Sequence, residues 1–174
     1  MSVIDEMLAA NALYAEELAR SGQQLLPDAQ VAVVTCMDAR IEAATAFGFQ
    51  VGMAHIIRNA GGRVSEALRS LAISQELLGT RAVAIIHHTD CGMLTFTDDQ
   101  LRRRLRDNLG ANADHVAFLP FSDIEQSVLD DLDAYRESRM VRQDIPVRGF
   151  IFDVKTGRLS EVKAAAAKQP AIFR

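Results

Sequence analysis

Two short segments of the chain, Thr-Cys-Met-Asp-Ala-Arg and His-His-Thr-Asp-Cys-Gly, contain side chains that bind metal ions. They supply the thiols of Cys36 and Cys91, the imidazole of His88 and the carboxylate of Asp38. Zinc in proteins is held by sulfur and nitrogen ligands in a tetrahedral arrangement. Because His88 and Cys91 are three residues apart, one turn can direct both side chains to a single ion. With Cys36 as the second sulfur, the sequence predicts a zinc site whose fourth position falls to Asp38 or to water.

Other interpretations of the two cysteines stay open on this reasoning. Buried cysteine often behaves as a small hydrophobic side chain. Cys36 and Cys91 can also form a disulfide if their strands are neighbours, although two cysteines in a chain of this size are not a disulfide framework. A purely structural zinc, closed by the carboxylate of Asp38, is also compatible with the spacing.

Arg40 follows Asp38 after one intervening residue. A guanidinium binds a carboxylate through two parallel hydrogen bonds, which would hold Asp38 ionised and away from the metal. The alternative is an ordinary ion pair in a surface loop, which contributes little to stability. A purely structural zinc site needs no guanidinium that competes for its fourth ligand, so we favour a catalytic role for Asp38 and Arg40.

The residues around these segments predict the strands that bring them together. Residues 31–35 and 82–87 form continuous apolar runs, which are typical of strands buried on both faces. Cys36 follows the first run and Cys91 lies shortly after the second. Ligands of open α/β sheets bind beyond the carboxyl ends of the strands, so the two cysteines are expected to converge there. A shorter strand is predicted over residues 54–57.

Helical patterns alternate with these strands, and a hairpin is expected near the end of the chain. The predicted helices are 3–20, 64–78, one from the capping box of Thr97 and Gln100 to about Leu109, and one from the capping box of Ser122 and Glu125 to about Val141. The predicted hairpin pairs residues 147–154 with 158–162. We therefore expect an α/β fold: a mostly parallel central sheet flanked by helices, with a C-terminal hairpin or antiparallel edge strand.

Length and composition are those of one globular domain. The 174 residues, 49% of them hydrophobic, predict a single domain over 1–174, with an N-terminal helical arm over 1–25 and a tail over 163–174. The net charge of -4 argues against a nucleic-acid partner. No apolar run approaches the roughly 20 residues that span a bilayer, so no membrane partner is expected. Acidic residues near the N-terminus and the low cysteine content favour a reducing, cytoplasmic location.

Three separated motifs resemble the signature segments of the β-class carbonic anhydrases. They are Cys36-x-Asp38-x-Arg40, Arg58-Asn59-Ala60-Gly61-Gly62 and His88-x-x-Cys91-Gly92. Their order and spacing match across residues 31–95, and the stretch from Ile86 to Leu94 resembles the short branch found in archaea and actinobacteria. The chain departs from common members of the family at Ala39, where many have Ser, and at His87, where Gly is common.

The resemblance implies a zinc lyase that reversibly hydrates carbon dioxide to bicarbonate and a proton by means of a zinc-bound hydroxide. It implies one Zn²⁺ per chain, held by Cys36, His88 and Cys91, with Asp38 able to act as a fourth ligand. Asp38 and Arg40 correspond to the catalytic pair beside the metal. Residues expected at the substrate pocket or supporting its backbone are Gly61, Gly62, Gly92 and His87.

The resemblance also implies a homodimer, or a dimer of dimers, in which the N-terminal helix packs around the partner subunit. Two other functions stay open at this point. One is hydrolysis of carbonyl sulfide or carbon disulfide on the same scaffold, because members of this lineage that take those substrates have similar sequences. The other is a non-catalytic structural zinc domain.

Overall fold

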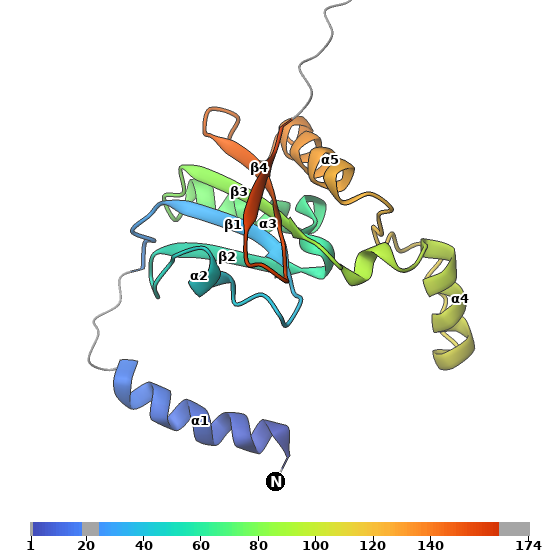
Figure 1. Cartoon of the computed structure of the whole chain (residues 1–174), viewed down its shortest axis with the longest axis horizontal. Helices are drawn as coiled ribbons and strands as arrows, with labels where there is room; N and C mark the ends of the chain where they lie inside the picture. Colours follow the sequence, from blue (N-terminus) through green and yellow to red (C-terminus); the bar gives the residue numbers. More distant parts are fainter. Residues whose placement is uncertain (1, 19–24, 164–174) are drawn as a thin grey trace, which may run out of the picture.

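A five-stranded sheet lies at the centre of the computed structural model, which describes residues 2–18 and 25–163 (Figure 1). The strand order is β2-β1-β3-β4-β5; the first four strands are parallel, and β5 is antiparallel to β4. The strands are β1 (Val31–Cys36), β2 (Ala54–Asn59), β3 (Ala82–His88), β4 (Val147–Phe152) and β5 (Leu159–Val162). The predicted α/β class, with a mostly parallel sheet and an antiparallel edge strand, is confirmed.

Parallel pairing places the carboxyl ends of β1 and β3 side by side. Thr35 of β1 lies opposite Ile86 of β3, so Cys36 and His88 end the two strands at the same edge of the sheet. Residues 32–36 of β1 are all buried, because helices or loops cover both faces of this strand. This double burial accounts for its continuous apolar sequence.

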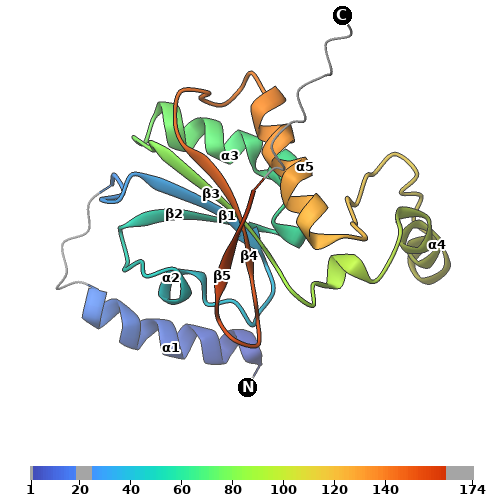
Figure 2. The ribbon, with the colours of Figure 1, turned by 45° about the horizontal axis from the view of Figure 1, so that its top comes forward.

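Helices α3 (Val64–Glu76) and α5 (Ile124–Glu137) cover one face of the sheet, and the short α2 (Ala43–Ala46) lies on the other (Figure 2). Apolar side chains from α3, α5 and the strands form one continuous core between them. Helix α5 approaches β4 closely at Gly149, where a Cβ would overlap the side chains of Val128 and Leu132. This close approach fixes the position of α5 against the sheet.

Two helices, α1 (Val3–Leu18) and α4 (Asp98–Leu109), stand apart from the sheet in both views (Figures 1 and 2). The side chains of residues 3–16 in α1 are all exposed. Neither these two nor any other helix in the described ranges combines the length and the apolar composition needed to cross a bilayer.

Several predicted boundaries agree with the structure to within two residues. Thr97 and Gln100 form the predicted capping box of α4, and Gly110 ends that helix with a φ of 64°. Strands β1, β2 and β3 extend one or two residues beyond their predicted ends, and α3 ends two residues earlier than predicted. The end of the first predicted helix, 19–20, and residues 164–174 of the predicted tail lie outside the described residues.

The predicted capping box of Ser122 and Glu125 is wrong by one residue. Asp123 is the N-cap of α5, and its carboxylate accepts a hydrogen bond of 2.8 Å from the backbone N–H of Gln126. Asp caps a helix as well as Ser does, so residue preference alone did not distinguish the two positions.

The end of α5 also differs from the prediction. The helix ends at Glu137 rather than near Val141. The hydroxyl of Tyr135 donates a hydrogen bond of 2.7 Å to the carbonyl of Arg142, which holds the following segment folded back against the helix. A tertiary contact therefore ends the helix before its apolar pattern runs out.

Candidate metal centre

The predicted metal ligands Cys36, His88 and Cys91 lie together at the carboxyl edge of the sheet. Their ligand atoms, two sulfurs and one imidazole nitrogen, all lie within 4.8 Å of one another, and all three residues are buried. Cys36 ends β1, His88 ends β3, and Cys91 lies in the turn that follows β3. Two neighbouring parallel strands thus bring together residues that are 55 positions apart in the sequence.

The backbone around the cysteines has features that permit this convergence. Asp90 has a φ of 56°, in the left-handed region that Asp and Asn tolerate better than most residues, and it turns the chain just before Cys91. Gly62 lies against β1, where a Cβ would stand 3.1 Å from the backbone nitrogen of Cys36. The N–H of Gly61 donates a hydrogen bond of 3.3 Å to the sulfur of Cys36. Gly62 thus packs closely against β1, and the backbone of Gly61 contacts the sulfur of Cys36.

The hydrogen bonding of His88 is that expected of a metal ligand. Its Nδ1 hydrogen-bonds the carbonyl of Thr89 at 2.9 Å, which leaves Nε2 as the nitrogen that can bind a cation. Nε2 is buried and has no hydrogen-bond partner among the described residues. Buried polar nitrogens are rarely left without a partner, so this atom is available to bind a cation. Two sulfurs and one nitrogen are the donors that Zn²⁺ prefers, and the residues present fit that ion.

The two neighbouring thiols shift each other's pKa in opposite directions. A hydrogen bond from Cys91 lowers the pKa of Cys36 to about 4, and the same contact together with burial raises the pKa of Cys91 well above its usual range. Burial acts to lower the pKa of His88, but contact with the Cys36 sulfur and its negative charge outweigh burial, so that pKa is raised. A divalent cation at this position would replace protons on Cys91 and His88.

Asp38 and Arg40 form the predicted pair beside the ligands. Arg40 donates from Nε to Oδ1 of Asp38 at 2.9 Å and from Nη2 to Oδ2 at 2.8 Å. These hydrogen bonds hold the pKa of Asp38 well below its usual range. Oδ2 of Asp38 lies 3.8 Å from Nε2 of His88, so the carboxylate stands next to the metal position while it is bound to Arg40.

Sequence reasoning missed a second partner of Arg40. Nη1 of Arg40 donates to the carboxylate of Asp90 at 2.6 Å, and Nη2 donates to the Asp90 carbonyl at 2.8 Å. Asp90 lies inside the second metal-binding segment, but it is 50 residues from Arg40 and no spacing rule connects them. Adjacent strand ends bring the two together, and the guanidinium is held between two carboxylates.

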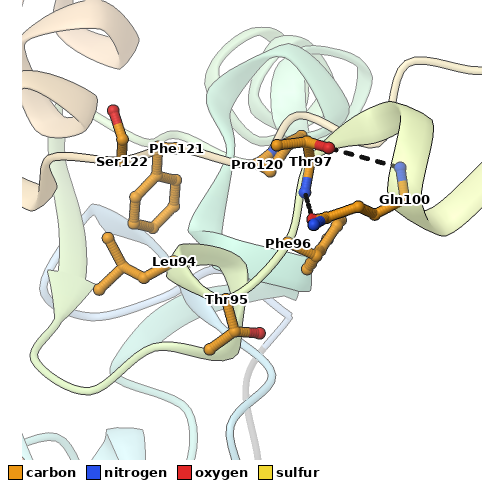
Figure 3. A pocket seen from close by; sticks show the side chains of 8 residues that line it. All are labelled: Leu94, Thr95, Phe96, Thr97, Gln100, Pro120, Phe121 and Ser122. Atoms are coloured by element: carbon orange, nitrogen blue, oxygen red, sulfur yellow. Dashed lines mark hydrogen bonds between the residues drawn. The ribbon is translucent and has the colours of Figure 1, made fainter.

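A cavity of about 520 Å³ opens beside the ligands. Cys36, Cys91 and Asp38 line it on the polar side, and most of the remaining wall is apolar or glycine: Met37, Ala39, Ala60, Gly61, Gly92, Met93, Thr95 and Phe96. A second cavity of about 400 Å³ shares Thr95 and Phe96 with the first and extends toward Phe121 and the start of α4 (Figure 3). Two of the three expected pocket glycines, Gly61 and Gly92, line the metal-side cavity, whereas Gly62 packs behind it.

His87 lies elsewhere than expected. The resemblance placed it among the residues expected at the substrate pocket or supporting its backbone, but it does not line the cavity beside the cysteines. The residue is completely buried and hydrogen-bonds Ser127 and Asp131 of α5. Successive side chains of a strand point to opposite faces, so His87 must face α5 when His88 faces the cysteines.

Comparisons with known proteins agree with this chemistry. Residues 31–117 match a family model described as carbonic anhydrase. A β-carbonic anhydrase 1 from Mycobacterium tuberculosis is 42% identical over 165 residues, which cover 93% of this chain and 99% of the relative. The chain belongs to the β-carbonic anhydrase family.

Further relatives cover the same fold and its neighbouring activities. The crystal structure of a carbonic anhydrase from Streptococcus mutans matches this β-carbonic anhydrase with a TM-score of 0.89 and 44% identity, covering 94% of this chain and 99% of the other. A carbon disulfide hydrolase from Acidianus is 28% identical over 151 residues, covering 73% of this chain and 74% of the relative. The chain is therefore similar to carbonic anhydrases and, at lower identity, to a carbon disulfide hydrolase.

The affinity of this β-carbonic anhydrase for zinc is expected to fall as the pH falls. Because the pKa values of Cys91 and His88 are raised, the metal-free site holds its protons more tightly than the free side chains do, and zinc must displace them. Each displaced proton should weaken binding about tenfold per pH unit of acidification. Competition with a chelator of known proton affinity, from about pH 6 to about pH 8, measures this slope. An affinity that does not change across this interval would contradict the assigned ligands.

Proposed function

We propose that this β-carbonic anhydrase catalyses the reversible hydration of carbon dioxide to bicarbonate and a proton, with one zinc ion held by Cys36, His88 and Cys91. The observation that carries the proposal is the cluster of two sulfurs and an unpartnered imidazole nitrogen within 4.8 Å, with the Asp38–Arg40 pair beside it. A metal site closed for structural purposes alone would have no use for a fourth donor held back by a guanidinium.

The residues around the metal position have distinct tasks. A bound zinc ion would lower the pKa of a coordinated water and so supply a nucleophile, but its two thiolate ligands would leave that water less acidic than three histidines do. The ionised carboxylate of Asp38 accepts a hydrogen bond from the attacking water and turns an oxygen lone pair toward the substrate carbon. Arg40 keeps Asp38 ionised and holds it in this orientation through two hydrogen bonds.

The cavity wall suits a small, uncharged substrate. Ala60, Met93 and Phe96 offer apolar contacts, whereas the polar groups gather on the side of Cys36 and Asp38. Carbon dioxide can therefore lie against the apolar wall with its carbon near the metal position. Bicarbonate, which is charged, is less favoured on that wall, and this difference assists its release.

Carbon disulfide or carbonyl sulfide hydrolysis is the second candidate, because carbon disulfide hydrolases are among the relatives of this chain. One zinc-loaded preparation, assayed for carbon dioxide hydration and for sulfide release from both alternatives, distinguishes the two. We expect the larger kcat/KM for carbon dioxide. Faster release of sulfide would assign the chain to the hydrolases, and no turnover with any of the three substrates would leave only a structural zinc domain.

Replacing Arg40 by Ala should lower turnover while zinc remains bound. Without the guanidinium, Asp38 is free to move onto the metal and take the position that the attacking water needs. A misplacement of this kind costs about 100-fold in rate. The assay is stopped-flow hydration of carbon dioxide, with zinc content measured on the same sample.

Arg148→Ala is the matched control for that variant. Arg148 makes a slightly shorter bidentate pair, at 2.7 Å for both hydrogen bonds, with Glu161 on β4 and β5, on the surface and outside the cavity. Turnover in Arg148→Ala should equal that of the unmodified chain. An Arg40→Ala enzyme as fast as this control would remove Arg40 and its pairing with Asp38 from the mechanism.

We propose further that the arm formed by α1 docks on a second copy of the chain. Ile4, Met7, Leu8 and Tyr14 lie on one side of this helix, and each has about half or more of its surface exposed. An apolar helix face of this kind is normally buried against another element. The proposal includes a cytoplasmic location, where the thiols of Cys36 and Cys91 stay reduced.

A charge in the middle of the apolar side of α1 should separate the copies. The unmodified chain is expected at twice its mass of 19.1 kDa in light scattering, and Met7→Glu is expected to shift the particle toward 19.1 kDa. Ala9→Glu places the same charge on the opposite, exposed side of the helix and should leave the mass unchanged. An unmodified chain that elutes as a monomer, or a Met7→Glu variant that keeps the doubled mass, would refute docking through α1.

A further inference from the structure

A buried carboxylate on α5 connects three segments behind the metal ligands. Asp131 is 1% exposed. Its Oδ2 accepts a hydrogen bond of 2.9 Å from Nε2 of His87, and its Oδ1 accepts one of 3.2 Å from the backbone N–H of Val64. Nε of Arg63 makes an ion pair with the same carboxylate at 3.2 Å. A carboxylate is retained at such a depth only when its charge is paired and hydrogen-bonded, and Asp131 meets that condition with three partners.

The side chain of His87 is held at both ring nitrogens and on one ring face. Its Nδ1 forms a hydrogen bond of 2.7 Å with Oγ of Ser127, one turn before Asp131 on α5. The imidazole also stacks on Phe121, with ring centroids 5.5 Å apart and 19° between the planes. Phe121 is one of the two aromatic side chains that line the second cavity in Figure 3, the other being Phe96. Both nitrogens and one face of the His87 ring are therefore held by the α5 side of the sheet.

The segments that Asp131 joins are the ones that carry or support the metal ligands. His87 directly precedes the ligand His88 at the end of β3. Arg63 and Val64 directly follow the glycine pair whose first N–H donates to the sulfur of Cys36. One buried carboxylate thus fixes the end of β3 and the loop against β1 to the same helix.

We propose that Asp131 is a positioning residue for the metal centre and acts through His87 and through the loop formed by residues 61–64. It touches neither the metal position nor the substrate cavity. It holds the strand end that carries His88 and the loop that contacts Cys36 in place before zinc arrives, so that less ordering is required on binding. The inference rests on the proposed function only through the zinc site and does not depend on which substrate is turned over.

A merely structural role for Asp131 is the alternative, and Tyr135 provides the matched control. Tyr135 lies one turn later on α5 and is equally buried, at 1% exposed. Its hydroxyl donates to the carbonyl of Arg142 at 2.7 Å and accepts from Nε2 of Gln75 at 2.9 Å, and none of these residues supports a metal ligand. Tyr135→Phe removes buried hydrogen bonds of α5 without touching the segments around the zinc site.

The test compares Asp131→Asn with Tyr135→Phe in the full chain, at a temperature where circular dichroism shows both folded. Asn keeps the acceptor for Val64 but presents an amide NH₂ to His87 and Arg63. Asp131→Asn should raise the zinc Kd, measured by chelator competition, about tenfold. It should also shift the thiolate-to-cobalt absorption bands of the cobalt-substituted protein. Tyr135→Phe should lower the melting temperature yet leave the Kd and the bands unchanged.

Ser127→Ala removes only the partner of Nδ1 and decides the question if Asp131→Asn does not fold. It should weaken zinc binding in the same direction by a smaller factor. The inference is overturned if the folded variants keep the zinc Kd and cobalt bands of the unmodified chain, or if Tyr135→Phe changes them equally. Turnover of carbonyl sulfide in place of carbon dioxide would overturn the proposed function and leave this result intact.

Discussion

The structure depends on two sulfurs and one imidazole nitrogen meeting at the ends of two adjacent parallel strands. Cys36 and His88 end β1 and β3 at the same edge of the sheet, and Cys91 returns to them through a turn that requires a left-handed Asp90. Burying Nε2 of His88 without a hydrogen-bond partner among the described residues is unfavourable, and a bound cation would offset this cost. Three features help to bring the ligand side chains together: the parallel register of β1 and β3, the loop that contains Gly61 and Gly62, and the position of α5.

The ion pairs of Arg40 distinguish this arrangement from a zinc site in which a carboxylate is the fourth ligand. Asp38 stands 3.8 Å from the metal-binding nitrogen of His88 and would be a natural fourth ligand. Arg40 competes for that carboxylate, and Asp90 holds the far side of the guanidinium. A zinc ion held by Cys36, His88 and Cys91 would keep a position open for solvent as long as Asp38 stays bound to Arg40. Ion pairs at a surface contribute little to stability, so the proposed role of this pair is chemical rather than structural.

The sequence predicted features that depend on neighbouring residues better than features that depend on packing between distant residues. The apolar runs before Cys36 and His88 predicted the strands, and the spacing of His88 and Cys91 predicted the ligands. The contact of Arg40 with Asp90 and the burial of His87 against Asp131 join residues more than 40 positions apart, and no periodicity encodes them. His87 faces α5 instead of the pocket because adjacent side chains of β3 point to opposite faces of the sheet.

X-ray absorption at the zinc edge of the purified, zinc-loaded chain tests the central claim most directly. The account predicts two sulfur ligands at about 2.3 Å, one imidazole nitrogen at about 2.0 Å and one further light atom. A shell without sulfur, or one with a single sulfur, would contradict the convergence of Cys36, His88 and Cys91 on one ion.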